Sequence, residues 1–151
     1  MRALIQRVTE ASVEVIDDDG NVHDSGRIGP GLVALVGFAS TEAPTALDWM
    51  AAKIADLRVF PGDGGEMDRS LRDTGDGLLV VSQFTLYADT RKGRRPDFTR
   101  AAPYDDAEAL YQLFCKRCET ELPRRVATGV FGARMRVRLV NDGPVTLWLE
   151  R

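Results

Sequence analysis

This 151-residue chain has few of the side chains that usually carry enzyme chemistry. Histidine occurs once, as His23, and cysteine occurs twice, as Cys115 and Cys118. A single histidine argues against a Ser-His-Asp triad, because histidine is the usual general base in such a site. One histidine and two cysteines also fall short of the four ligands that a structural zinc site needs. We therefore expect neither a metal nor a cofactor.

Long hydrophobic runs are also missing. No apolar segment approaches the roughly 20 residues that a membrane-spanning helix requires. Arg2 and Arg7 place charges where a signal peptide would have its apolar region. The sequence therefore predicts a cytoplasmic protein without a membrane partner. Its length and its 44% hydrophobic content suit a single domain, residues 1–151, with a sizeable core.

The two cysteines are spaced i, i+3 in a predicted helix. Two functional interpretations are a redox dithiol and half of a zinc site. The third interpretation is a pair of reduced, partly buried thiols that only fill space in the core. We favour the third, since the only histidine is far away in sequence.

The formal net charge of -3 argues by itself against a nucleic-acid partner, but the charges are unevenly distributed. The stretch 116–138 holds seven basic and two acidic residues, and a second basic cluster, 91–95, precedes Pro96. Such asymmetry allows a phosphate-binding face on an acidic protein. An ordinary solvated surface explains the same composition equally well.

Hydrophobic patterning predicts an α+β organisation. Strands are expected at 3–9, 12–16, near Arg27 and at 31–38, with a hairpin turn at 17–20. Pro44 opens a helix with Leu47, Met50, Ile54 and Leu57 on one face, and residues 61–65 follow it as a loop. Pro103 opens a second helix with Ala107, Leu110, Tyr111, Phe114 and Cys118 on one face. We see no internal repeat and no linker.

Three further strands are expected in the second half of the chain. Residues 78–81 form a continuous apolar run, which is typical of a strand buried on both faces. Residues 134–139 alternate arginine with apolar residues, which predicts a half-buried strand with a basic outer face. Residues 145–150 supply the last strand.

The apolar run 78–81 leads into Ser82-Gln83-Phe84-Thr85-Leu86, a candidate site at a strand end. A hydroxyl of Ser82 or Thr85 could act as a nucleophile if a base lay beside it. Alternatively, both hydroxyls only satisfy backbone groups where the strand ends. Main-chain amides near Gln83, Phe84 and Thr85 could also stabilise the oxyanion of an ester under attack by water.

A Gly143-Pro144 step stands where a plain hairpin turn is expected between two strands. An X-Pro bond adopts the cis form far more readily than any other peptide bond. Glycine before proline also removes the Cβ that would restrict its backbone. The pair is suited to act as a rigid wall of main-chain carbonyls.

Residues 82–86 together with Asn141-Asp142-Gly143-Pro144-Val145-Thr146 resemble the two signature motifs of the D-aminoacyl-tRNA deacylases. The resemblance covers the whole chain, including 1–8, the loop 93–98, the helix 107–111 and the stretch 128–135. Either motif alone is short, but the two in order and in register with the rest are specific.

The resemblance implies a homodimeric α/β (α+β) fold with a mixed or antiparallel barrel-like sheet and two main packing helices. It implies hydrolysis of the ester that joins a D-amino acid to the 3′ end of tRNA. The expected partners are tRNA and a second copy of the chain, with no DNA partner. In that family the Gly-Pro peptide is cis and enters the site of the other subunit. Gly143 and Pro144 would then exclude L-amino acids but not glycine, so that mischarged glycyl-tRNA is a second expected substrate.

The resemblance also assigns roles to individual residues. Ser82, Gln83, Phe84 and Thr85 would line the catalytic pocket. Three more residues match positions beside it: Met135 and Phe131 near the adenosine and the pocket wall, and Arg7 against the Gly-Pro motif. Asp68 stands where many members have asparagine after methionine, so its contacts are in question.

Two mechanisms and two classes of function follow from these assignments. Thr85 is the nucleophile, or the 2′-hydroxyl of the terminal adenosine helps water to attack. A non-catalytic tRNA 3′-end-binding module, or a small β-rich interaction protein, is the alternative to an enzyme. Because a main-chain wall ignores side-chain identity, we expect broad specificity among D-amino acids.

Overall fold

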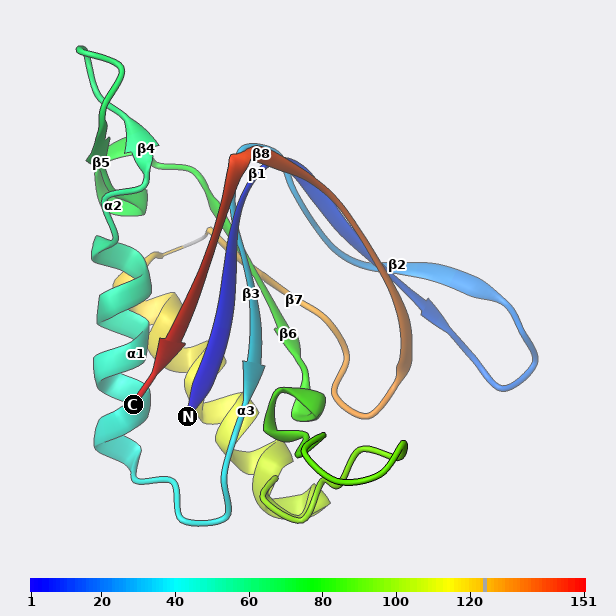
Figure 1. Cartoon of the computed structure of the whole chain (residues 1–151). Helices are drawn as coiled ribbons and strands as arrows, with labels where there is room; N and C mark the ends of the chain where they lie inside the picture. Colours follow the sequence, from blue (N-terminus) through cyan, green and yellow to red (C-terminus); the bar gives the residue numbers. More distant parts are fainter. Residues whose placement is uncertain (124) are drawn as a thin grey trace.

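The structure is a computed structural model that describes residues 1–123 and 125–151; Arg124, one of the bases in the stretch 116–138, lies outside them. The strands are β1 Arg2–Ile16, β2 Val22–Ile28, β3 Gly31–Gly37, β4 Phe60–Pro61, β5 Met67–Arg69, β6 Gly77–Ser82, β7 Val126–Thr128 and β8 Arg134–Glu150. The helices are α1 Pro44–Asp56, α2 Leu71–Thr74, α3 Tyr104–Glu121 and the 3₁₀ turn η1 Phe84–Tyr87. The expected α+β class is confirmed, with α1 and α3 side by side on one face of the main sheet (Figure 1).

The main sheet is mixed and strongly curled. Its strand order is β2-β1-β3-β6-β7, and β8 pairs with β1. β1 is antiparallel to β2, β3 and β8, whereas β6 is parallel to β3 and to β7. The Ser25 hydroxyl of β2 donates to the Thr128 carbonyl of β7 at 3.1 Å, which joins the two ends of the strand order. The sheet therefore closes nearly into a barrel, as expected.

β1 is one continuous strand, so the prediction of separate strands at 3–9 and 12–16 is wrong. Between those ranges Glu10 remains paired with Val140 of β8. Register shifts on both sides of Val8 disturb the local alternation. The pairing that carries the strand through comes from residues more than 120 positions away, which a local pattern does not reveal.

β8 is also continuous, so Gly143-Pro144 does not form a turn between two strands. β8 pairs with β1 on both sides of the step. Opposite the single residue Arg7, β8 has the four residues 142–145, and the additional residues form a bulge. The Gly143-Pro144 peptide bond in this bulge is cis, as expected.

Two hydrophobic cores lie on opposite faces of β3 and β6. The helix-side core includes Ile5, Leu32, Ala34, Val36, Leu47, Met50, Ile54, Leu78, Val80 and Phe114. The barrel core consists of Val8, Ala11, Val13, Ile28, Val33, Leu79 and Val81. Successive residues of β6 therefore enter different cores, which confirms that the apolar run 78–81 is buried on both faces.

The two long helices begin where proline predicts. Pro44 occupies the first turn of α1, and Leu47, Met50 and Ile54 are fully buried against the sheet, whereas Leu57 follows the helix end. Pro103 is the N-cap of α3. The third helix, α2, was not predicted from the sequence. A capping box between Ser70 and Asp73 initiates its single turn.

Cys115 and Cys118 are free thiols buried in the helix-side core. Burial raises the pKa of Cys115 to about 11 and raises the pKa of Cys118 as well. A thiol held in its protonated form is a poor nucleophile and a poor metal ligand. The interpretation as structural thiols is therefore supported.

The basic face of β8 also matches the prediction. Arg134, Arg136 and Arg138 are exposed, while the alternating Met135 and Val137 are partly buried against the barrel core. Among the described residues, no helix has the length and apolar character needed to span a membrane.

Candidate functional site

β6 delivers the predicted motif to one end of the curled sheet. The strand ends at Ser82, and the chain then enters η1. The main-chain N–H of Gln83 donates to the Val36 carbonyl of β3 at 2.7 Å. Gln83 N–H is thus engaged by the neighbouring strand, and the expectation that it could stabilise an oxyanion is wrong.

The next two amides are available to a ligand. Within residues 1–123 and 125–151, the N–H groups of Phe84 and Thr85 have no acceptor. They precede the first bond of η1, which runs from Leu86 N–H to the Gln83 carbonyl. Adjacent free amides at the start of a helical turn are oriented to bind a negative oxygen.

The Gln83 side chain donates through Nε2 to the Thr85 hydroxyl oxygen. Thr85 is exposed, and neither its hydroxyl nor that of Ser82 bonds a backbone group among the described residues. The interpretation that both hydroxyls only cap the strand end is therefore not supported. The Gln83–Thr85 bond instead fixes the start of η1.

A pocket of about 500 Å³ opens beside this strand end, and we call it the β6 pocket. It is lined by Val81, Ser82, Gln83, Phe84, Ala102, Tyr104, Ala107, Phe131, Gly132, Ala133, Met135 and Val137. Five predicted site residues thus meet there: Ser82, Gln83, Phe84, Phe131 and Met135. Thr85, Arg7, Gly143 and Pro144 are not among the residues that line it.

The lining of the β6 pocket is mostly apolar. None of the described residues that line it is an acid, a histidine, a cysteine, a lysine or an arginine. Chemistry in this pocket therefore relies on main-chain amides, on neutral side chains and on groups that a ligand brings with it.

An aromatic cluster forms one wall of the pocket. The Phe131 ring contacts Tyr104 edge-on, with centroids 5.1 Å apart, and lies 5.7 Å from the ring of Tyr111. The Tyr111 hydroxyl lies 2.9 Å from the Val80 carbonyl and 3.3 Å from the Gly129 carbonyl. Burial strongly raises the pKa of Tyr111, so it remains a neutral donor that ties β6 to the segment before β8.

Gly132 contributes a close approach that sequence reasoning missed. It has φ +72°, and a Cβ added there would lie 2.1 Å from the Tyr104 hydroxyl oxygen. Any larger residue would therefore require the Tyr104 side chain to move, and the positive φ itself favours glycine. Val137 was also missed, although the alternation of β8 places it on the same side as Met135.

The bulge of β8 lies elsewhere on the sheet and is held by Arg7. Arg7 Nε lies 3.0 Å from Asp142 Oδ2, an ion pair in which the Nε–H is not directed at the carboxylate. Arg7 Nη1 donates to the Val59 carbonyl. Asn141 Nδ2 lies 3.0 Å from each of the Arg7 and Val145 carbonyls. Arg7 therefore connects Asp142 of the bulge to the segment at Val59.

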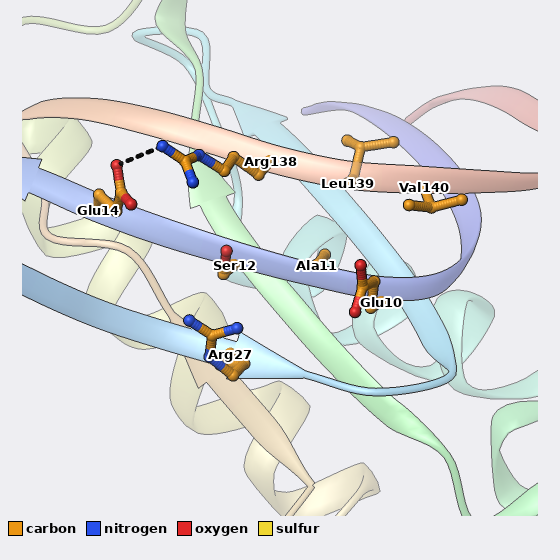
Figure 2. A pocket seen from close by; sticks show the side chains of 8 residues that line it. All are labelled: Glu10, Ala11, Ser12, Glu14, Arg27, Arg138, Leu139 and Val140. Atoms are coloured by element: carbon orange, nitrogen blue, oxygen red, sulfur yellow. Dashed lines mark ion pairs between the residues drawn. The ribbon is translucent and has the colours of Figure 1, made fainter.

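A second cavity, of about 240 Å³, has the opposite character (Figure 2). We call it the Ser12 cavity; it is lined by Glu10, Ala11, Ser12, Glu14, Arg27, Arg138, Leu139 and Val140. Arg138 Nη2 lies 3.3 Å from Glu14 Oε2, and Arg27 Nη2 lies 3.2 Å from Asp24 Oδ2. Arg138 therefore pairs with a glutamate of the cavity, whereas Arg27 pairs with Asp24, which does not line it. None of the predicted site residues lines it.

Two residues that the sequence raised as questions lie outside the β6 pocket. Asp68 is exposed on β5 and pairs with Arg58, with Oδ1 and Nη1 2.9 Å apart. His23 lies on β2 opposite Val15 of β1. Neither lines the β6 pocket, so Asp68 in place of asparagine does not alter its wall, and His23 does not supply a base there.

Comparison with known proteins identifies close relatives. The sequence model of a family described as D-Tyr-tRNA(Tyr) deacylase matches residues 4–150. A D-aminoacyl-tRNA deacylase of Salinibacter ruber is 54% identical over 151 residues, covering 100% of this chain and 97% of that protein. A D-aminoacyl-tRNA deacylase of Thermomicrobium roseum is 52% identical, covering 99% of this chain and 94% of that protein.

Solved structures with the same fold are also known. A structure titled as a c-Myc DNA unwinding element binding protein has TM-score 0.91 and 39% identity, covering 100% of this chain and 99% of that chain. A second structure, described as a probable eukaryotic D-amino acid tRNA deacylase, has TM-score 0.82 and 22% identity. The match covers 98% of this chain and 97% of that chain. The second likeness concerns the fold alone.

Proposed function

This chain belongs to the D-Tyr-tRNA(Tyr) deacylase family, and from that premise we propose how its two motifs divide the work. The protein is an enzyme that hydrolyses the ester bond of D-aminoacyl-tRNA. In our proposal the β6 pocket holds the aminoacyl ester and the terminal adenosine. The free amides of Phe84, which lines this uncharged pocket, and of the next residue, Thr85, carry this assignment.

The chemistry follows from what these amides can do. Attack on the ester carbonyl places a negative charge on its oxygen, and the two N–H groups stabilise that oxyanion. Removing one such donor from an oxyanion site typically costs about 2.7–4 kcal/mol of transition-state stabilisation. Ser82, Gln83, Met135 and Phe131 position the substrate around that point.

Water is the attacking group in this mechanism. The adjacent 2′-hydroxyl of the adenosine relays a proton from the water to the 3′-oxygen, which leaves as the ester C–O bond breaks and the free D-amino acid forms. Two observations disfavour Thr85 as a nucleophile: its hydroxyl accepts a hydrogen bond from Gln83, and no histidine or carboxylate of the described residues lines the pocket. A substrate that supplies its own assisting group does not need a protein base.

Thr85→Ala separates the two mechanisms. We expect kcat to fall by less than about tenfold, because the main-chain N–H of residue 85 remains; loss of a true nucleophile costs several orders of magnitude. Single-turnover hydrolysis of D-tyrosyl-tRNA measures this, with circular dichroism to confirm folding. A folded variant with no turnover would establish Thr85 as the nucleophile. A substrate with hydrogen in place of the 2′-hydroxyl tests the water mechanism from the other side.

Chirality is screened by the Gly143-Pro144 bulge in our proposal. Both residues are exposed and do not line the pocket of their own chain, so the screen requires the bulge of a second copy. Arg7 and Asn141 hold the bulge in one conformation, and a steric screen needs this rigidity. The wall leaves no room for the side chain of an L-amino acid, whereas any D-side chain and the hydrogen of glycine pass.

Deacylation of matched substrates tests this screen. We expect rapid hydrolysis of several D-aminoacyl-tRNAs, measurable hydrolysis of glycyl-tRNA and no enzymatic hydrolysis of the L-forms. Sedimentation analysis is expected to give a dimer. Equal rates on D- and L-tyrosyl-tRNA, or full activity in a strictly monomeric protein, would overturn the screen. We place the enzyme in the cytoplasm with its tRNA substrate and propose no DNA or membrane partner.

A further inference from the structure

The loop between η1 and α3 leaves the β6 pocket and returns to it. Phe84 lines the pocket before the loop, and Ala102 lines it after the loop. The main chains of Asp89 and Asp97 exchange two hydrogen bonds, of 2.7 and 2.9 Å, which form a short stem. Residues 90–96 extend beyond that stem as an exposed tip, which we call the basic tip.

The basic tip concentrates positive charge that the protein does not neutralise. Lys92, Arg94 and Arg95 are exposed, and no carboxylate of residues 1–123 and 125–151 lies within ion-pair distance of any of them. Arg91 differs, because it pairs with Asp89 of the stem. Three adjacent free cations on a chain of net charge -3 form a local site for anions.

The loop that carries the basic tip contacts the pocket wall through an aromatic ring just after the stem. The rings of Phe98 and Phe84 meet edge-on, with centroids 5.0 Å apart. Asp97 accepts hydrogen bonds from the main-chain N–H of Thr99 at 2.7 Å and from its hydroxyl at 2.6 Å. These bonds lower the pKa of Asp97. The basic tip therefore has a defined position relative to Phe84.

We propose that the basic tip binds phosphate groups of the tRNA acceptor end, and that Lys92, Arg94 and Arg95 make these contacts. This inference rests on the deacylase function of the β6 pocket. In this proposal the nucleotide chain whose terminal ester occupies the pocket leaves it past Phe84, which lines the pocket and contacts the loop through Phe98. A basic surface beside exposed aromatic rings is the usual combination for a single-stranded nucleic-acid end. The tip supplies affinity for the tRNA and takes no part in the chemistry.

The test compares a long and a short substrate. The double variant Arg94→Ala/Arg95→Ala removes two charges from the tip, and Lys53→Ala/Lys116→Ala removes two exposed charges from α1 and α3 as a matched control. For the tip variant we expect kcat/KM on D-tyrosyl-tRNA to fall at least about tenfold at low salt, with a salt slope shallower by about 2. D-tyrosyl-adenosine, which lacks the phosphates, should be hydrolysed at the wild-type rate.

Each outcome decides the proposal. If kcat/KM on D-tyrosyl-tRNA fell equally in the tip variant and in the control variant, the loss would reflect the total charge of the protein and not the tip. That result would overturn the inference. If the tip variant lost activity on D-tyrosyl-adenosine as well as on D-tyrosyl-tRNA, the tip would act on the pocket and not on the tRNA phosphates. That result would also overturn the inference. If the wild-type protein hydrolysed neither substrate, the assigned function would fail instead, and titration of uncharged tRNA against the same variants would still test the contact. An unchanged salt slope in that titration would refute it.

Discussion

The β6 pocket and the Ser12 cavity differ in the side chains that line them. The Ser12 cavity contains two glutamates and two arginines, whereas the β6 pocket has no charged residue among the described residues that line it. A search for clustered titratable groups would select the Ser12 cavity. Its arginines, however, are already paired with Glu14 and Asp24. Charge density and the proposed site therefore do not coincide in this protein, because the proposed site relies on main-chain donors and shape.

The largest expected effect tests shape at the bulge. In Gly143→Ala the new Cβ would lie 2.9 Å from Val145 Cγ2 and 3.0 Å from Arg7 Nη2, at φ +116°. A residue held in such a strained backbone conformation destabilises the native structure by about 1–3 kcal/mol. We therefore expect the bulge to shift and relieve the strain. We expect the rate of D-tyrosyl-tRNA hydrolysis to fall by about 10- to 100-fold. We also expect the ratio of the rates on D- and L-tyrosyl-tRNA to decrease.

The matched control for this change is Gly20→Ala. Gly20 has φ +86° in the first hairpin turn, and no atom lies within 4 Å of the position that its new Cβ would take. This variant should lose stability but keep full chiral selectivity. If Gly143→Ala kept the full preference for the D-form, the bulge would not be the chiral screen. The contrast between a site based on shape and a cavity rich in charge would then be weaker.

A smaller effect is expected inside the β6 pocket. Gly132→Ala would place a Cβ 2.1 Å from the Tyr104 hydroxyl oxygen and displace that side chain from Phe131. We expect kcat/KM to fall by about tenfold, and the second change Tyr104→Ala to restore part of it by removing the clash. Steady-state kinetics of the two single variants and the double variant measure the coupling. Strict additivity would mean that the clash does not control the pocket.

The smallest effect is expected in the Ser12 cavity. Arg27→Gln removes an exposed charge whose only ion pair among the described residues is with Asp24. Exposed ion pairs contribute little, so we expect kcat/KM to stay within about twofold and the Tm within about 2 °C. A deacylation assay and a thermal melt suffice. A large loss of activity would show that the charged cavity, too, takes part in function.

Local sequence patterns predicted the elements whose buried residues recur at regular spacing within a few positions of one another. The spacing of Leu47, Met50 and Ile54 predicted α1, and the apolar run 78–81 predicted β6 with both faces buried. The candidate residues Ser82, Gln83 and Phe84 were found because this strand ends beside them.

The remaining features depend on contacts between distant parts of the chain. β8 continues past Gly143-Pro144 because β1 pairs with it on both sides, which no local window contains. Gly132 was missed because the side chain it lies against, Tyr104, is 28 positions earlier in the chain. Gln83 N–H could be assigned only once β3 was known to accept from it.

The passage of β1 and β8 through both cores has a consequence for how the protein opens. β8 packs Met135 and Val137 against the barrel core, and Leu147 and Leu149 against the helix-side core. Because the two cores share these strands, we expect them to unfold together. Amide hydrogen exchange should therefore give one common opening free energy for both. The Gly143-Pro144 bulge, at the junction, then keeps its orientation until the whole domain unfolds.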